Sequence, residues 1–185
     1  MRDSIITWLF SLTILLLPVF LKAQSTQKEA IRDQFFRMNE VKEGALNLYF
    51  RLKPLDLPGN PVLLAYRGAA SAASAGSVGG PQKKLQYFSR GKSELEQAVR
   101  LKPADAEIRF LRMATQLNAP GFLGYSGEIE SDKKVILSVL SSADHNDPNT
   151  YLYFRIADFL LKTDILTPLE KKQLQLTKQE LTTKN

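Results

Sequence analysis

The chain has 185 residues, a net charge of +6 at pH 7, no cysteine and one histidine. The lack of cysteine excludes a disulfide framework, so the fold must be stabilised by buried apolar surface. Basic residues alternate with acids and form no long runs, which argues against nucleic acid as a partner. A single histidine without cysteine does not build a zinc site of the usual kind.

The first 23 residues have the three parts of a secretory signal peptide. Arg2 begins a short basic region, residues 5–21 form an almost unbroken apolar run, and Ala23 offers a small residue at a cleavage point. The run is shorter than the roughly 20 residues of a membrane span. We therefore predict a periplasmic or secreted protein, cleaved after Ala23, with one domain over residues 24–185. If the segment were not removed, it would tether the protein to a membrane.

The early part of this domain shows helical periodicity. A first helix is expected over residues 27–38 and a second over 40–52, with Val41 on its buried side, because apolar residues recur at three- and four-residue spacing. Asn60–Pro61 then begins a third helix, since asparagine caps free amides and proline suits the first helical position. The glycine-rich residues 76–81 are expected to be a loop.

The segment 83–117 carries the clearest pattern. A long amphipathic helix, with Leu85 and Phe88 on its buried face, ends before Pro103, because proline disfavours helical geometry in the residue before it. A second apolar helix follows to residue 117. The connection over 118–127 contains three glycines and a proline, and this composition predicts that it is not helical.

Three more helices complete the prediction. One is expected over residues 129–142, one after the start signal Asp147–Pro148, and one after Thr167, whose capping box includes Glu170. No strand pattern occurs after residue 24. The predicted fold class is all-α, with about 7–8 helices after the signal peptide.

Short motifs recur at similar intervals. The tetrapeptide Arg-Leu-Lys-Pro occurs at residues 51–54 and again 49 residues later. An Arg-x-Ala motif begins at Arg67, Arg112 and Arg155, at spacings of 45 and 43 residues. Since each copy lies in the helix after such a break, the pattern predicts helix pairs repeated about every 45 residues.

One of these pairs resembles the tetratricopeptide family of helical-hairpin proteins. The matching positions are Leu64 and Gly68 in the first half of the family's pattern and Gly91, Leu95, Ala98 and Pro103 in the second half. Arg67 and Ser71 stand where the family has leucine and tyrosine, and about 11 extra residues separate the halves. The resemblance implies antiparallel hairpins stacked as a short α-solenoid, with a concave groove lined by the first helices.

Two groups of residues are candidate contact sites. The first is a row of arginines on the first helices, which would bind the carboxylates of an acidic peptide or protein: Arg67, Arg109, Arg112 and Arg155. Ion pairs within the chain are the alternative for this row. The second group would act as exposed contact anchors on the connecting loop: Phe122, Leu123 and Tyr125. The alternative is that this loop folds back onto the core.

No catalytic or metal-binding pattern accompanies these groups. His145 lies in a segment of turn composition, and the glycine-rich loop lacks the Gly-Lys-Ser/Thr of a phosphate-binding loop. We therefore predict no metal and no cofactor, and no enzyme. The expected function is an exported scaffold or adaptor that binds a protein or peptide in a helical groove. A small-ligand-binding or enzyme-accessory protein, with a pocket near residues 118–127, is the alternative.

Overall fold

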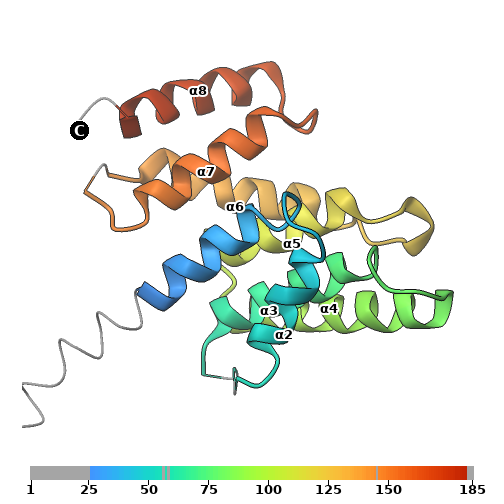
Figure 1. Cartoon of the computed structure of the whole chain (residues 1–185). Helices are drawn as coiled ribbons and strands as arrows, with labels where there is room; N and C mark the ends of the chain where they lie inside the picture. The colour runs from blue at the N-terminus through green and yellow to red at the C-terminus, as the bar shows by residue number, and fades with distance from the viewer. Residues whose placement is uncertain (1–25, 56, 58, 145, 183–185) are drawn as a thin grey trace, which may run out of the picture.

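The computed structural model describes residues 26–55, 57, 59–144 and 146–182. The elements begin with a helix over residues 26–36, here named the N-terminal helix, and continue with α2 (Gly44–Leu52), α3 (Pro61–Ser74), α4 (Pro81–Leu101), α5 (Ala106–Asn118), η1 (Gly121–Leu123), α6 (Ile129–Ser142), α7 (Thr150–Leu161) and α8 (Pro168–Thr182). All regular structure in the described residues is helical (Figure 1), which confirms the all-α prediction. The predicted signal peptide, residues 1–23, and His145 lie outside the described residues.

The helices pack in consecutive pairs. α3 packs along α4, α5 along α6, and α7 along α8. The pairs also meet through their first helices, because α3 contacts α5, and Phe110 of α5 meets Phe159 of α7 with 5.2 Å between ring centroids. The first helices α3, α5 and α7 therefore follow one another through the molecule, and this arrangement positions the site described below.

Local capping explains where several helices begin. The side chain of Asn60 accepts a hydrogen bond from the amide of Leu63 at 3.2 Å, with Pro61 at the first helical position. Thr167 and Glu170 form the predicted capping box, each side chain accepting from the other's amide. At Asp147 the prediction is wrong by two residues, because this carboxylate accepts from the amide of Asn149 and α7 begins only at Thr150.

Small residues bring α3 and α4 into backbone contact. A Cβ added at Gly91 would lie 2.4 Å from the carbonyl oxygen of Gly68 and 2.6 Å from the amide nitrogen of Ala72. Both glycines lie in helices, where glycine costs about 1 kcal/mol relative to alanine. The close approach is the physical reason for glycine at both positions.

Two residues expected in the core are exposed. Val41 is exposed because α2 begins at Gly44, so Val41 lies in the preceding turn. Leu85 is exposed in the first turns of α4, whereas Phe88, three residues further on, is buried. The connection 118–127 also differs from the prediction, since it contains the single 3-10 turn η1.

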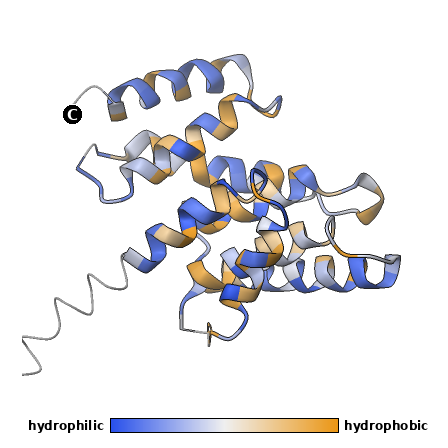
Figure 2. Cartoon of the chain, viewed as in Figure 1, coloured by the Kyte–Doolittle hydropathy of each residue, from blue (hydrophilic) through white to orange (hydrophobic). Residues whose placement is uncertain are grey.

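The outermost helix contributes little to the core. The ribbon of α8 is largely hydrophilic in Figure 2, and this helix buries Leu174 and Leu181. A search of the described residues for a helix of sufficient length and apolarity to cross a membrane finds none.

Candidate functional site

The N-terminal helix lies against all three first helices. The Phe35 ring meets the Tyr66 ring of α3 edge to face, at 5.4 Å between centroids. Phe36 stacks on Phe110 of α5 at 5.7 Å, and the guanidinium of Arg155 in α7 lies 4.4 Å from the centre of the Phe36 ring. Figure 1 shows this helix in blue beside α5. We name the surface of α3, α5 and α7 that it covers the first-helix face.

A buried ion pair fixes the N-terminal helix at the centre of this face. Arg32 donates two hydrogen bonds to the Glu107 carboxylate, from Nε to Oε1 at 2.7 Å and from Nη2 to Oε2 at 2.6 Å. The Tyr66 hydroxyl donates to the same carboxylate at 2.8 Å, and Arg32 also donates to Asn149 at 2.8 Å. Arg32 and Glu107 are both buried. Such a bidentate pair is strong and sets the orientation of both side chains.

The start of α5 explains the position of Glu107. Asp105 caps this helix, its carboxylate accepting from the amides of Glu107 and Ile108 at 3.0 and 3.1 Å. Glu107 therefore lies in the first turn, where the helix dipole favours a negative charge. Burial disfavours the charged form of Arg32, but the hydrogen bonds and charge of Glu107 outweigh burial and raise the pKa of Arg32 above its usual value.

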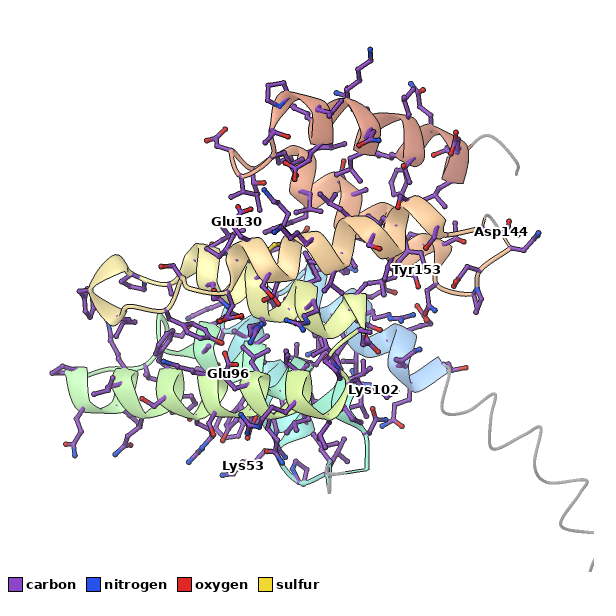
Figure 3. The ribbon with its side chains drawn as sticks, turned by 180° about the vertical axis from the view of Figure 1, so that it is seen from behind. Lys53, Glu96, Lys102, Glu130, Asp144 and Tyr153 are labelled. Atoms are coloured by element: carbon purple, nitrogen blue, oxygen red, sulfur yellow. The ribbon has the colours of Figure 1, made fainter. Side chains whose placement is uncertain are left out.

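A second buried network lies between α4, α5 and α6. Arg112 donates to both carboxylate oxygens of Asp132, at 2.8 and 2.7 Å, and to Glu96 at 2.7 Å. Arg109 donates to Asp132 at 2.8 Å. Figure 3 shows Glu96 on α4, on the side of that helix toward α5 and α6. Burial again opposes the charge of Arg112, but Asp132 and Glu96 raise its pKa. The network joins three helices.

The structure places the row of arginines between helices. Arg67 bonds Glu94 of α4 at 3.1 Å, and Arg109 and Arg112 bond Asp132 as described. Arg155 lies on the Phe36 ring. The first three arginines thus form ion pairs within the chain, the alternative that the sequence left open. In this conformation each of the three guanidiniums has a carboxylate of the same chain as a partner, and a row that binds an acidic partner stays a prediction.

The three candidate residues of the connecting loop differ in their exposure to solvent. Phe122 is 88% exposed, whereas Tyr125 is 6% exposed. Tyr125 meets the Phe88 ring edge to face at 5.8 Å, its hydroxyl donates to Glu96 at 2.9 Å, and Leu123 packs against the same small cluster. Tyr125 is therefore not an exposed contact anchor, because its ring closes the end of the α3–α4 pair. Phe122 alone of the three side chains is largely open to solvent.

Three of the six tyrosines should ionise late. Burial raises the pKa of Tyr66, Tyr125 and Tyr153, with further contributions from Glu107, Glu96 and Asp147, respectively. The unfolded chain loses phenolic protons near pH 10 while the folded state keeps them, so stability should fall as the pH rises above about 10. We expect an absorbance titration of the folded protein to show phenols that ionise only above the usual range. Tyr66→Phe should remove one late phenol, and ionisation of all six together near pH 10 in folded protein would contradict the assignment.

Other surface features offer little chemistry. A depression of about 370 Å³ lies between the N-terminal helix and α2, lined by Ala30, Asp33, Gln34, Arg37, Met38, Val41, Gly44 and Asn47. It does not include residues 118–127. Among the described residues, no group of histidine, cysteine, aspartate or glutamate side chains could hold a metal ion. The first-helix face is therefore the strongest candidate site.

Comparisons with protein-family models, with curated proteins and with solved structures find no match to this chain. The fold and site define it at the level of class, as an all-α protein with helices packed in pairs and a further helix on the first-helix face.

The central residues of this site, Arg32, Glu107 and Tyr66, were not among the predicted contact residues. One signal was present in the sequence: Arg32 is followed at three and four residues by Phe35 and Phe36, which places a cation on the same helical face as two aromatic rings. A cation on the apolar side of a helix indicates a buried carboxylate elsewhere in the fold.

Proposed function

We propose that the chain is a protein-interaction module that binds a helical segment of a partner protein on the first-helix face. The observation that carries the proposal is the N-terminal helix itself, a helix of this chain that packs on this surface. Its aromatic side chains contact Tyr66 and Phe110, and its Arg32 reaches Glu107. The predicted signal peptide supports an exported location for this role.

The face has the composition of a protein-binding surface. Aromatic rings and an arginine–carboxylate pair form its contacts with the N-terminal helix, and tyrosine and arginine are residue types that dominate binding energies at interfaces. Two charged groups of opposite sign, Glu107 and Arg155, lie near these rings. They give a ligand helix a fixed register and direction, because each charge requires a matching group opposite it.

Photocrosslinking in the cells that produce the protein tests this function. Tyr151 of α7 is 56% exposed and its ring lies 5.8 Å from the Arg155 guanidinium, so it marks the edge of the face. A photoreactive phenylalanine at Tyr151 should give a discrete crosslinked partner. Leu85 of α4 is 55% exposed and lies on a second helix, which makes it a control of matched exposure.

We expect the crosslink from position 151 and not from position 85. Equal products from both positions would indicate nonspecific contact. An absence of products from position 151, with the protein folded and abundant, would contradict an interaction role for this face.

A further inference from the structure

The N-terminal helix contacts the first-helix face as a ligand would. Three of its contact residues, Arg32, Phe35 and Phe36, are spaced at i, i+3 and i+4, which places them on one side of a helix. On the face itself, the cation meets a carboxylate and each ring meets another ring. This one-sided contact is how an amphipathic helix is recognised by a partner surface.

We propose that the N-terminal helix is a displaceable internal ligand, and that the partner presents a helix of the same chemistry. That helix carries a basic side chain followed three and four residues later by two aromatic side chains. The inference rests on the proposed function and names the chemistry of its partner. It differs from the acidic partner expected from the arginine row.

The charge at the centre of the face decides between a basic and an acidic partner. Glu107 is buried and receives hydrogen bonds from Arg32 and from the Tyr66 hydroxyl. If Arg32 leaves, this carboxylate keeps Tyr66 but loses its cation. A basic side chain from the partner restores the pair, whereas an acidic one would place two like charges together in a site of low dielectric.

The connection between the N-terminal helix and α2 is a short tether. Residues 37–43 form a short turn, and Glu43 has a φ of 56°, in the left-handed region that residues with a side chain adopt at a cost. The same short tether holds the helix at a high effective concentration, so an external helix must compete with it.

A labelled peptide with the sequence of residues 26–38 is the probe, measured by fluorescence anisotropy against the full protein. Phe36→Ala weakens the resident helix by removing the ring that contacts Phe110 and Arg155. Because apparent affinity scales with the fraction of open protein, we expect the peptide to bind this variant at least about tenfold more tightly than wild type. Phe50→Ala, at an exposed ring of α2, is the control and should match wild type.

Adding Glu107→Gln to Phe36→Ala should weaken peptide binding by about tenfold or more, because the peptide's basic side chain loses its charged partner. A peptide with Arg32→Glu should not bind either variant. Equal affinities for the Phe36→Ala and Phe50→Ala proteins would overturn the proposal. So would a concentration-dependent dimer of wild type that Phe36→Ala abolishes, since the face would then belong to a second copy of the chain.

Hydrogen exchange on the wild-type protein tests displacement without any substitution. Amides of residues 27–36 should exchange through local opening, at least about tenfold faster than core amides of α3 and α5. Exchange of both sets only by global unfolding would overturn the proposal.

If position 151 captures a partner while the basic–aromatic peptide never binds, the partner chemistry fails and the proposed function stands. If the peptide binds as expected but position 151 captures nothing, the function fails and the chemistry of the face stands.

Discussion

Replacing Asp132 with alanine should destabilise the protein by about 3–5 kcal/mol, the cost of removing one partner from a buried ion pair. Asp132 is 0% exposed and accepts three hydrogen bonds, two from Arg112 and one from Arg109. Without it, the buried guanidinium of Arg112 keeps Glu96 as a close partner but loses the charge that faces it most directly. The free energy of unfolding, measured by denaturant titration, gives the size of this loss.

A matched control compares the loss of a buried carboxylate with the loss of an exposed one. Glu40→Ala removes an exposed carboxylate, whose partner Arg37 is also exposed, and exposed pairs are worth about 0–1 kcal/mol. We expect Glu40→Ala to leave the unfolding free energy nearly unchanged. A loss below about 1 kcal/mol for Asp132→Ala would mean that Glu96 and Glu128 can rearrange to compensate Arg112, and that the network does not hold α5 to α6.

The helices could be predicted from sequence because their signals are local. The cap at Asn60, the break at Pro103 and the capping box at Thr167 each act within a few residues of the helix end that they define. Helical periodicity extends this local information to most of the buried positions. It fails at Val41 and Leu85, where a helix begins late or its first turns extend beyond the core.

The direction of the charged side chains could not be predicted in the same way. Arg112 and Asp132 are 20 residues apart, and Arg32 and Glu107 are 75 apart. Sequence spacing indicated that Arg112 lies in a helix, and this is correct. Whether its guanidinium faces solvent or a carboxylate depends on which helix packs against it, and single-sequence periodicity contains no information about that pairing.

The N-terminal helix gives the clearest case of this limit. Its helical state and its apolar residues, including Phe35, follow from the pattern. Its position on the first-helix face depends instead on complementarity between Arg32 and Glu107, which lie 75 residues apart in the sequence. The candidate site therefore emerged from tertiary packing, although each of its residues lies in a helix that the sequence had predicted.

Gly91→Ala should also destabilise the protein, through crowding. The added methyl group would lie 2.4 Å from the Gly68 carbonyl oxygen and 2.7 Å from the Ala72 Cβ, and the obstacle includes backbone that cannot rotate away. Overpacking usually costs 1–3 kcal/mol, and the better helix propensity of alanine returns about 1 kcal/mol of this. Since both helices must separate, we expect a crowding cost at the upper end of this range and therefore a net loss of about 2 kcal/mol, measured as the change in unfolding free energy.

A graded series tests whether crowding is the cause. Gly68→Ala would meet the Gly91 oxygen at 2.9 Å and two side-chain atoms at 3.1 Å, so it should cost less than Gly91→Ala. Gly79→Ala, where an added Cβ meets nothing within 4 Å, is the control and should change stability little. The loss of stability should be largest for Gly91→Ala, smaller for Gly68→Ala and smallest for Gly79→Ala. This order follows from the distances between the added Cβ and its nearest neighbours. Similar losses at all three positions would contradict close helix packing as the cause, because Gly79 has no neighbour to crowd and restriction of the unfolded chain by an added methyl group stabilises the fold.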